Sequence, residues 1–380
     1  MPWRSKTVEK LREEFVASAM SCTNFSALCR EFGITRKTGY KWLKRYAESE
    51  PLSDKSRAPH LIANKTPEAA EQAIIALRKS NPGWGAKKLK EVLEREGHEI
   101  PCVKTVNNIL NRYGCISPEE SSKHKAFIRF EKDGCNDMWQ TDFKGEFRMA
   151  DQKYCYPLNI IDDHSRFVIK TAVCQGTANV VIPTFRHAFE EFGMPDSVLS
   201  DNGSQFAGLR QGFTQFEKWL MNHDILPIHG RIKHPQTQGK IERFHRAMKD
   251  ELLRYTVIHD IADADIQLQK WRDKYNNQRP HEALNMMCPA DVYVPSQRIY
   301  SDEVKRFEYG GNYHVIKVNS WGYVRFDKRQ VYLSDTMIGE YIEFRPNESG
   351  EAFTACYRNF KIAEFSTSDG KLLNRRISRL

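Results

Sequence analysis

The chain has 380 residues, of which 40% are hydrophobic and 28% charged, and its formal net charge at pH 7 is +9. This length exceeds one ordinary hydrophobic core and predicts about two to four domains. No apolar run is long enough to cross a bilayer, and the nine cysteines form neither a Cys-x-x-Cys pair nor a zinc-spaced cluster. Composition therefore excludes a membrane-spanning protein, a disulfide framework and a zinc module.

The positive charge favours a polyanionic partner, because Lys and Arg side chains near phosphates release condensed counterions. Charge alone is weak support, since many basic proteins only present solvated cationic faces. The N-terminus has no apolar core of a signal peptide. We expect the chain to stay, with reduced thiols, in the compartment where it is made.

Three helical patterns occupy the first predicted domain, residues 1–50. Gly33 separates the second pattern from the third, and Thr35 can cap the third. Two short helices joined by a glycine turn are typical of a helix-turn-helix, whose recognition helix presents its first residues to base edges. The alternative is a small helical bundle with solvated basic residues. The candidate DNA contacts are Arg36, Lys37, Thr38 and Lys41.

A polar linker over 51–65 precedes a second helical unit over 66–116, interpreted as a helix-turn-helix or winged-helix domain. Thr66 is the expected N-cap of its first helix, with Pro67 in the first turn. Two such units in series would bind two stretches of one DNA site. The candidate DNA contacts of this unit, which are amide, hydroxyl or cationic side chains, are Lys87, Lys88, Lys104, Thr105, Asn108 and Arg112.

Beyond a connector over 117–136, mixed strands and helices predict an α/β core over 137–257. "MWQTDFKGEFRM" and "YCYPLNIIDDHSRFVIKTAVC" predict three strands, with turns at Ala150-Asp151 and at Asp163-His164-Ser165. A helix ended by Gly193, the strand "DSVLS", the helix "LRQGFTQFEKWLMNHD", the strand-like "ILPIHG" and the long helix "QTQGKIERFHRAMKDELLRY" follow. The expected product is a mixed sheet with helices on its faces.

Three acidic residues occupy positions that this sheet could bring together. Asp142 lies in the first strand, Asp201 ends the fourth strand, and Glu242 lies in the long helix. Carboxylate oxygens suit Mg²⁺, and two such ions about 4 Å apart can assist in-line displacement at a phosphodiester. Ordinary explanations compete: Asp is common in turns after strands, and Glu242 with Arg246 is a common i,i+4 pair of solvated helices.

Other acidic residues are weaker candidates for the same role. The Asp162-Asp163 pair opens a Ser-Arg turn and is interpreted as hairpin chemistry, with Asp163 near the site. Asp250 and Glu251 lie two turns beyond Glu242 and lack its preceding Gln-Gly-Lys context.

The last part of the chain predicts a helix from Ile261 to Tyr275 and, within 258–300, an extended segment containing three prolines that wraps the core. Short β-like runs over 301–368 predict a small barrel, followed by a basic tail over 369–380 that is a candidate for disorder. Arg325, Lys328 and Arg329 of this barrel could touch the DNA backbone, but a structural barrel is nearly as good an interpretation.

Five motifs in order, "MWQTDF", "DDHSRF", "LSDNGSQF", "HPQTQGKIERFHRAMKDE" and "YNNQRPHEAL" with "CPADVY", resemble the DDE transposases of bacterial insertion sequences. The resemblance is closest to the IS481-like group, related to the IS3 transposases and retroviral integrases, and it extends to about Ser296. It implies an RNase H-like core between N-terminal helix-turn-helix domains and an SH3-like C-terminal β-barrel. The segment between Asp201 and Glu242 is longer than is typical of the wider family.

By this resemblance Asp142, Asp201 and Glu242 are the catalytic residues and the metal ligands, holding two Mg²⁺ ions for which Mn²⁺ can substitute. Gly203 would shape the loop beside the metal. The further DNA contacts that the resemblance implies around the site are Asn202, Gln205, Gln238, Lys240, Arg243, Arg246 and Lys249.

The implied function is that of a transposase, which binds the terminal inverted repeats of an insertion sequence and catalyses Mg²⁺-dependent strand cleavage and strand transfer. The implied partners are double-stranded DNA, both transposon ends and target, and further copies of the chain in at least a dimer, in a bacterial cytoplasm close to the nucleoid and away from membranes. The alternatives are a nuclease that only cleaves and a sequence-specific DNA-binding regulator on the same scaffold.

Overall fold

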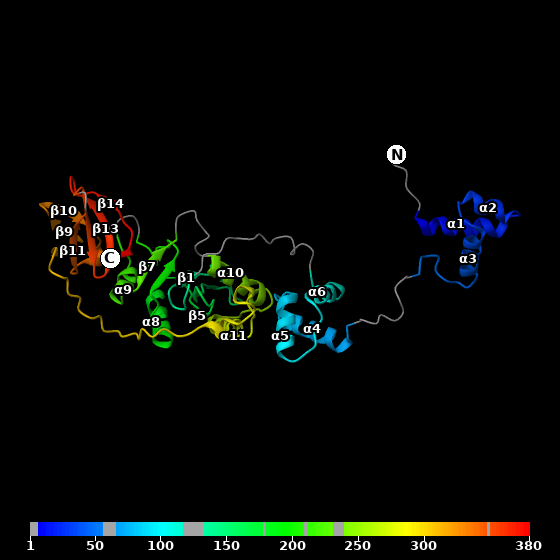
Figure 1. The fold of residues 1–380 in the computed structure, drawn as a ribbon, viewed down its shortest axis with the longest axis horizontal. Helices are drawn as coiled ribbons and strands as arrows, with labels where there is room; N and C mark the ends of the chain where they lie inside the picture. Colours follow the sequence, from blue (N-terminus) through cyan, green and yellow to red (C-terminus); the bar gives the residue numbers. More distant parts are fainter. Residues whose placement is uncertain are drawn as a thin grey trace. The chain divides into compact units, whose positions relative to one another are not determined.

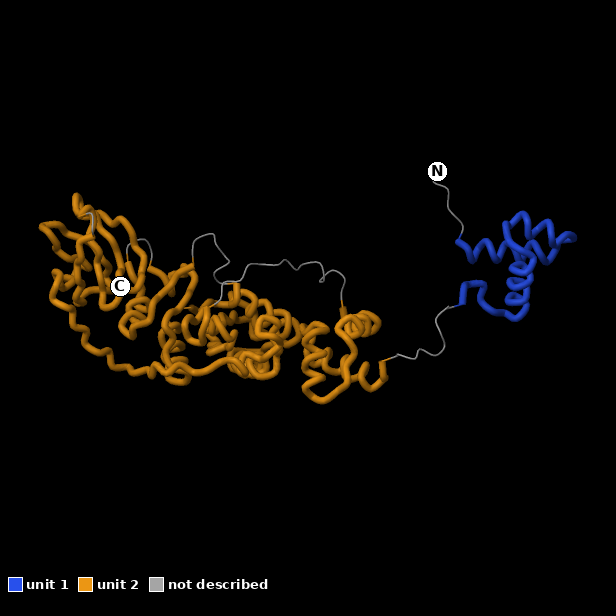
Figure 2. The backbone as a smooth tube through the Cα atoms, in the orientation of Figure 1, with its two compact units in different colours: residues 1–65 blue, residues 66–380 orange. Residues whose placement is uncertain are grey.

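The computed structural model describes residues 7–55, 66–116, 132–177, 179–208, 212–230, 239–347 and 350–380. The chain divides into two compact units, residues 1–65 and 66–380 (Figure 2). Each unit is described by itself. The predicted linker over 51–65 and connector over 117–136 lie largely outside the described residues.

The first unit contains helices α1 (Val8–Ser21), α2 (Phe25–Glu31) and α3 (Arg36–Ala47) within residues 7–55. Thr35 caps α3 as predicted, since its side chain accepts a hydrogen bond from the backbone N–H of Thr38. Gly39 allows α3 to lie close to the other helices, because a Cβ at this position would stand 2.9 Å from Cys29 Sγ and from the Phe15 ring. The three predicted helices are confirmed.

Helices α4 (Glu68–Ser80), α5 (Ala86–Arg95) and α6 (Val103–Arg112) open the second unit. They close on a small core that includes Ile74, Leu89 and Val106, none of which is exposed. The predicted N-cap at Thr66 is wrong by one residue. Pro67, extended at φ −54° and ψ 139°, is itself the cap residue and makes no side-chain capping bond, so the helix begins at Glu68.

The central sheet has the strand order β5-β4-β1-β6-β7 among the described residues. Strand β1 runs antiparallel to β4 and parallel to β6, and β6 runs parallel to β7. The strands are β1 (Trp139–Phe143), β4 (Leu158–Asp162), β5 (Val168–Ala172), β6 (Ser197–Ser200) and β7 (Leu226–His229). This mixed sheet confirms the predicted α/β core.

The three strands predicted before the first core helix are instead five. Strand β1 ends at Phe143, and Gly145 at φ +81° turns the chain into a separate two-stranded ladder. The members of this ladder are β2 (Phe147–Arg148) and β3 (Tyr154–Cys155). The predicted turns at Ala150-Asp151 and Asp163-His164-Ser165 are both present.

Helices pack on both faces of the sheet (Figure 1). Adjacent residues of β4 show the division: Ile160 belongs to the cluster with α8 and α9, whereas Ile161 belongs to the cluster with α10 and α11. The helices are α8 (Val181–Phe192), α9 (Gln215–Asn222), α10 (Gly239–Met248) and α11 (Ile261–Asn277). Residues at the ends of the inner strands can therefore meet α10, which covers one face of the sheet.

Two predicted helices differ at their ends. Helix α9 begins at Gln215, later than predicted, because Thr214 and Glu217 form a capping box at that point. The long helix after residue 238 is α10 followed directly by η2 (Lys249–Leu253), a π-helical turn. Its predicted start over 236–238 lies outside the described residues.

The proline-containing segment after α11 lies along the core as predicted but is not wholly extended. It forms η3 (Glu282–Leu284) and the short helix α12 (Pro289–Val292), which Pro289 opens. Tyr293 then stacks on Phe167 of the core at 4.3 Å between ring centroids. The backbone N–H of Ser296 donates to Phe192 O at the end of α8.

The C-terminal region is a β structure, but the predicted barrel is not confirmed, since its sheets are not closed. Among the described residues β9 pairs only with β10, and a larger sheet runs β14-β13-β12-β11-β8 with β15 on β13. The strands are β8 (His314–Lys317), β9 (Tyr323–Phe326), β10 (Arg329–Tyr332), β11 (Tyr341–Pro346), β12 (Ala352–Tyr357), β13 (Phe360–Ser366), β14 (Leu372–Asn374) and β15 (Ser378–Arg379), with η4 (Asp335–Met337) after β10.

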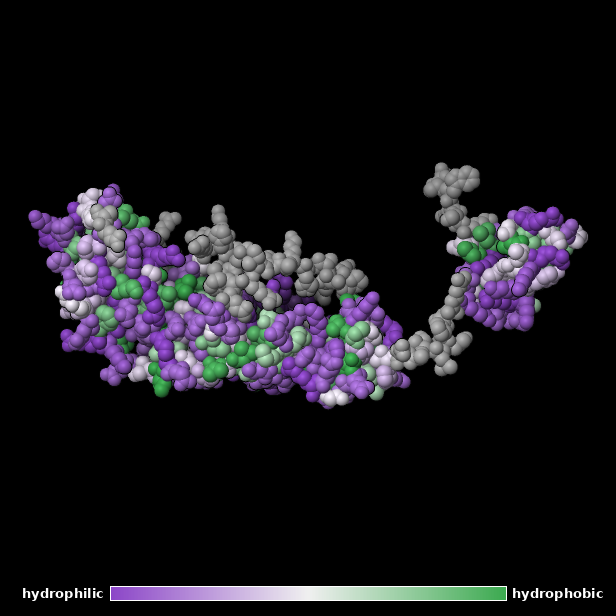
Figure 3. All heavy atoms as spheres, in the orientation of Figure 1, coloured by the Kyte–Doolittle hydropathy of each residue, from purple (hydrophilic) through white to green (hydrophobic). Residues whose placement is uncertain are grey.

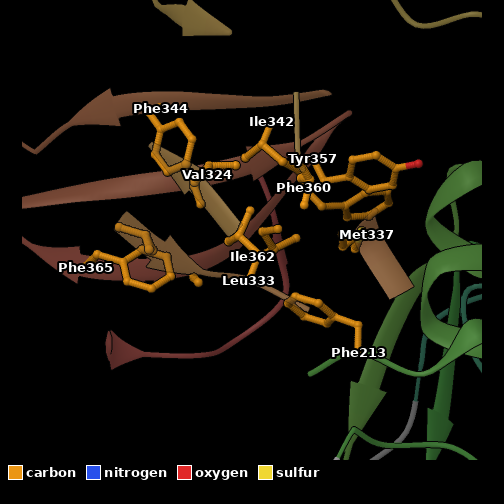
Figure 4. Close-up of a cluster of buried hydrophobic side chains, with 14 of the residues drawn as sticks. Phe213, Val324, Leu333, Met337, Ile342, Phe344, Tyr357, Phe360, Ile362 and Phe365 are labelled. Atoms are coloured by element: carbon orange, nitrogen blue, oxygen red, sulfur yellow. The ribbon is translucent and has the colours of Figure 1, made fainter. Parts of the chain in front are cut away.

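A shared apolar core holds these two sheets against the α/β core. Phe344 and Phe365 of the larger sheet and Val324 of the smaller lie in one cluster, which Phe213, from the loop before α9, enters from the side (Figure 4). The prediction of a disordered tail is wrong. Strands β14 and β15 pair with β13, and Arg375 donates to Gly212 O and Leu333 O.

The visible face of the molecule is mostly hydrophilic, with hydrophobic side chains scattered over it (Figure 3). Within the described ranges, no helix combines the length and the apolar character that crossing a membrane requires.

Candidate active site

The pairing of β1 with β6 determines where two of the candidate carboxylates lie. In this parallel pair Gln140 is opposite Leu199, so Asp142 and Asp201, each two residues further along, stand at equivalent positions. Neighbouring strands lie about 4.8 Å apart, and residues in register point to the same face. The predicted neighbourhood of the first and fourth strands is confirmed.

Asp201 sits in a tight loop directly after β6. Its Oδ1 accepts a hydrogen bond of 2.9 Å from the backbone N–H of Gly203. A Cβ on Gly203 would lie 2.9 Å from that Oδ1 and 2.8 Å from Gln205 Oε1, so a glycine lets all three groups come together. Asn202 Nδ2 donates to Gly230 O at 2.8 Å and ties the loop to the end of β7. Ordinary turn chemistry thus also holds Asp201 at the strand tip.

Helix α10 crosses the face of β1 that carries Asp142. Gln140, two residues earlier and on the same face, accepts a hydrogen bond from the backbone N–H of Ile241 at 3.3 Å. One turn further along α10, His245 Nδ1 lies 3.7 Å from Asp142 Oδ2, and its Nε2 lies 3.1 Å from Asn159 Nδ2. Glu242, one residue after Ile241, is exposed beside this crossing.

The charges of both other candidate carboxylates act on Asp142. Burial, then the charge of Asp201 and, more weakly, that of Glu242 raise the pKa of Asp142 to about 7. Burial and the nearby Lys144 lower the pKa of His245 to about 3, so this imidazole is neutral and supplies no compensating charge at pH 7. A divalent cation would relieve this repulsion.

The three carboxylates are coupled but do not form a closed site. Over the ranges that the structure describes, no group of three His, Cys, Asp or Glu side chains is placed to hold a metal ion. The donor chemistry nevertheless suits Mg²⁺: two carboxylates lie at the ends of neighbouring strands, and the third acidic side chain is near enough to act on Asp142. The assignment of Asp142, Asp201 and Glu242 stays a prediction.

The competing acidic residues have structural partners. Asp162 accepts hydrogen bonds from Asn136 N and from both the N–H and the hydroxyl of Ser165, which builds the predicted turn. Asp163 is fully buried; it accepts from Gln140 Nε2 at 2.7 Å and forms an ion pair with Lys240 at the start of α10. Asp163 therefore anchors the helix that carries Glu242.

The two acidic residues beyond Glu242 are also engaged. Glu251 accepts hydrogen bonds from the guanidinium of Arg279 at 2.7 to 3.0 Å, and Asp250 pairs with Arg254 at 3.2 Å. Both side chains therefore have partners other than the candidate site.

In the first unit, Arg36, Lys37 and Lys41 are exposed along α3, as a recognition helix requires. Lys41 Nζ also lies 4.8 Å from the centroid of the Trp42 ring. The Thr38 hydroxyl lies 2.9 Å from that of Thr35 and takes part in the helix start.

In the second helix-turn-helix unit, residues 66–116, the candidate DNA contacts divide into two groups. Lys104 and Asn108 are exposed on α6. Thr105, on the same helix, is half-buried, and Arg112 pairs with Glu71. Lys87 instead pairs with Glu282 of the core at 2.9 Å. Burial lowers the pKa of Lys88 to about 7, with Arg279 adding to the effect. The surroundings of Lys87 and Lys88 favour contact with the core.

Along α10, Arg243, Arg246 and Lys249 are exposed, whereas Lys240 is half-buried in its ion pair with Asp163. Gln238 lies outside the described residues.

Sequence reasoning missed three neighbours of Asp142, namely His245, Asn159 and Lys144. His245 could have been found from its i,i+3 spacing to Glu242. Asn159 depends on the β1–β4 register, where it lies opposite Asp142.

Models of known families match most of this architecture. Residues 133–235 and 223–289 each match a model described as an integrase core domain. Residues 11–60 match a helix-turn-helix domain model, and residues 38–110 match a homeodomain-like domain model. The N-terminal part of the chain thus matches helix-turn-helix and homeodomain-like models, and the central part matches integrase core models.

Individual relatives come from mobile genetic elements. An uncharacterized 31.7 kDa protein of insertion element IS407 from Burkholderia multivorans is 22% identical over 240 residues, 62% of this chain and 84% of that protein. A transposase for an IS21-like insertion sequence element from Bacteroides fragilis is 20% identical over 66% of this chain, spanning about half (53%) of its own length. The HTLV-2 integrase catalytic core domain in complex with magnesium is 18% identical, covers 42% of this chain and 97% of that chain, and has a TM-score of 0.33.

The family-model and sequence matches confirm the recognition made from the motifs. Residues 133–289 match integrase core domain models, and the sequence relatives include proteins of insertion sequences.

Replacing Asp142 tests the raised pKa of its carboxyl group. Because the folded pKa of Asp142 is raised to about 7, its burial lowers stability progressively as the pH rises from about 4 to 7. Without divalent ions, Asp142→Asn should raise the free energy of unfolding at pH 8 by about 1–4 kcal/mol and change it little at pH 4. Urea denaturation with chelator present measures both. A variant no more stable than wild type at pH 8 would contradict the raised pKa of Asp142.

Lys88 gives a second dependence on pH. Its folded pKa of about 7 lies below the ordinary 10.5, so the cost of burying the ammonium is full below pH 7 and is lost as the pH rises towards 10.5. Wild-type stability should therefore rise from pH 7 to 9, and Lys88→Met should remove this rise and stabilise the protein at pH 6. Thermal unfolding is the measurement. Affinity for duplex DNA should change less than about twofold; a decrease as large as that of Lys104→Met would restore Lys88 as a DNA contact.

Proposed function

We propose that this protein is a transposase that binds the ends of an insertion sequence and catalyses DNA strand cleavage and strand transfer. The observation that carries the proposal is the parallel register of β1 and β6. With this register, Asp142 and Asp201 lie at the ends of two neighbouring strands, beside the helix of Glu242. The integrase-core matches over 133–289 support the same reaction class.

The three carboxylates would hold divalent cations, with Mg²⁺ the expected ion, two per site, and Mn²⁺ a substitute. Bound there, the ions would polarise the scissile phosphate and assist both the attacking and the leaving oxygen of an in-line displacement. The residues of this chain do the positioning. Gln140 and the Asp163–Lys240 pair hold the start of α10 against β1, and Asn202 ties the Asp201 loop to β7.

The cationic residues along α10 would hold the DNA backbone next to the carboxylates. Arg246 follows Glu242 by four residues on α10, which is the same side of that helix, and Lys249 is the first residue of η2; both are exposed. Arg243 is exposed on the adjacent side. Asn202 and Gln205 lie close enough to Asp201 to contact the same DNA strand.

The two helix-turn-helix units would recognise the terminal inverted repeats. In the first unit Arg36, Lys37, Thr38 and Lys41 lie in the first turns of α3, where a recognition helix meets base edges. In the second unit Lys104, Thr105, Asn108 and Arg112 lie on α6. Joining two DNA ends requires at least a dimer, acting on chromosomal DNA in the bacterial cytoplasm.

The two alternatives make different products. A nuclease on this scaffold would release cut ends and join none, and a regulator would bind DNA without metal-dependent chemistry. The coupling among three carboxylates at a sheet edge favours an enzyme over a regulator, because DNA binding alone gains nothing from clustered negative charge.

Single replacements of the carboxylates test the reaction. With labelled duplex carrying the element's end and with Mg²⁺, wild type should yield both nicked and joined products. Asp142→Asn, Asp201→Asn and Glu242→Gln should each lower the rate at least about 100-fold, because each removes a ligand of the reaction's cations, while duplex binding stays within about threefold. Asp250→Asn is the matched control. Metal-dependent nicking without joining would favour the nuclease.

Recognition by α3 can be tested on the same helix. Arg36→Ala and Lys37→Ala should each weaken binding to the terminal duplex about tenfold or more. In a variant that has lost a phosphate contact, the slope of log binding constant against log salt concentration should be smaller by about one. Lys44→Ala, at the other end of α3 and paired with Glu48, is the control expected to have little effect. Equally weakened binding in all three variants would indicate only unspecific charge attraction.

A further inference from the structure

The second helix-turn-helix unit contacts the catalytic core through a buried carboxylate. Glu251 lies in η2, the π-helical turn that continues the helix of Glu242, and its side chain is only 8% exposed. From the core side, Arg279 clamps it with hydrogen bonds to both oxygens. From the second helix-turn-helix unit, residues 66–116, Trp84 Nε1 donates to Glu251 Oε2 at 3.3 Å. One carboxylate thus joins two parts of the chain separated by more than a hundred residues.

The loop before α5 is shaped to receive Glu251. A Cβ on Gly83 would lie 2.4 Å from Glu251 Cγ, which is closer than real side chains approach, and Cγ cannot swing away without moving the carboxylate. Gly85, two residues later, has nothing within 4 Å of the corresponding position. The close approach at Gly83 is therefore specific to the contact with η2.

Further contacts surround this centre. Arg95 Nη2 donates to Met286 O at 2.9 Å, and Lys274 Nζ donates to Ser80 O at 3.0 Å. The Lys87–Glu282 pair is more than half exposed on both sides and adds little. Glu251 is a buried charge with several hydrogen-bond partners, and removing a partner from such a group is strongly destabilising, unlike breaking an exposed ion pair.

We propose that Glu251 is a positioning residue that locks the second helix-turn-helix unit to the helix of Glu242 and thereby fixes the position at which DNA bound by α6 is cut. The locking itself is independent of the proposed function, whereas its effect on the cleavage position rests on it. The continuous path from α10 into η2 is what couples the DNA-binding unit to the carboxylates. π-helical turns of this kind are frequent at functional sites.

The test compares Gly83→Ala with Gly85→Ala in the full chain, with Glu251→Gln as a third variant. Amide hydrogen exchange is followed over residues 249–253 without DNA or metal, because Gly85 is the N-cap of α5 and its replacement alone can alter exchange in that helix. Gly83→Ala should speed exchange at the contact at least tenfold while Gly85→Ala behaves as wild type. Glu251→Gln weakens the pair with Arg279 without adding a Cβ at Gly83, so comparing it with Gly83→Ala separates damage to the core from loss of the contact. Unchanged exchange in Gly83→Ala would overturn the locking.

The effect on cleavage is read with end-labelled duplex carrying the element's end and Mg²⁺. Wild type and Gly85→Ala should cut at one position, whereas Gly83→Ala should bind with similar affinity and cut at several positions. A single unchanged position in Gly83→Ala would overturn the positioning role even if exchange is faster. Absence of cleavage by wild type would refute the proposed function. The exchange comparison would still decide whether the second helix-turn-helix unit is locked to the helix of Glu242.

Discussion

The parallel pairing of β1 with β6 is the constraint on which the site depends. A shift of one residue in this register would turn Asp142 to the opposite face of its strand relative to Asp201. The register is held by burial on both faces, since Trp139 and Val198 lie in the cluster under α8 and Ile161 of the adjoining strand lies under α10. The apolar packing that makes the sheet thus also determines where the acidic side chains project.

The cost of this arrangement is electrostatic, and the surrounding residues do not remove it. Burial and the charge of Asp201 raise the pKa of Asp142 to about 7, and the neighbouring His245 is neutral. By contrast, Asp163, which is more deeply buried than Asp142, has a cationic partner in Lys240 and two further hydrogen-bond donors. One buried aspartate therefore stabilises the fold and the other is arranged for a positively charged ligand. The difference between them distinguishes a structural carboxylate from a candidate catalytic one.

Much of the architecture could be predicted from the sequence because its signals are local. Thr35 caps α3, Gly193 ends α8 at φ +73°, and the alternation in "NII" divides the two faces of β4. The motifs also indicated Asp142 and Asp201 as partners, and the β1–β6 register agrees with this. The identity of the third ligand was predicted from motif context and stays a prediction.

What could not be predicted depends on contacts between distant segments. The break of β1 at Gly145 and the ordering of the tail by β13 arise from tertiary pairing. His245 and Asn159 join the site through a helix crossing and a strand register, neither of which is visible in spacing alone. Lys88 looked like a DNA contact because it is a lysine near a predicted recognition helix, and only the packing against the core shows its burial.

The most direct measurement is the position of Mn²⁺ in crystals of the protein bound to DNA, located by anomalous scattering. The account predicts density between the carboxylates of Asp142 and Asp201, with Glu242 turned towards it. Manganese bound elsewhere, or no ion at this edge while the DNA is in place, would contradict the claim that the β1–β6 register builds a metal site.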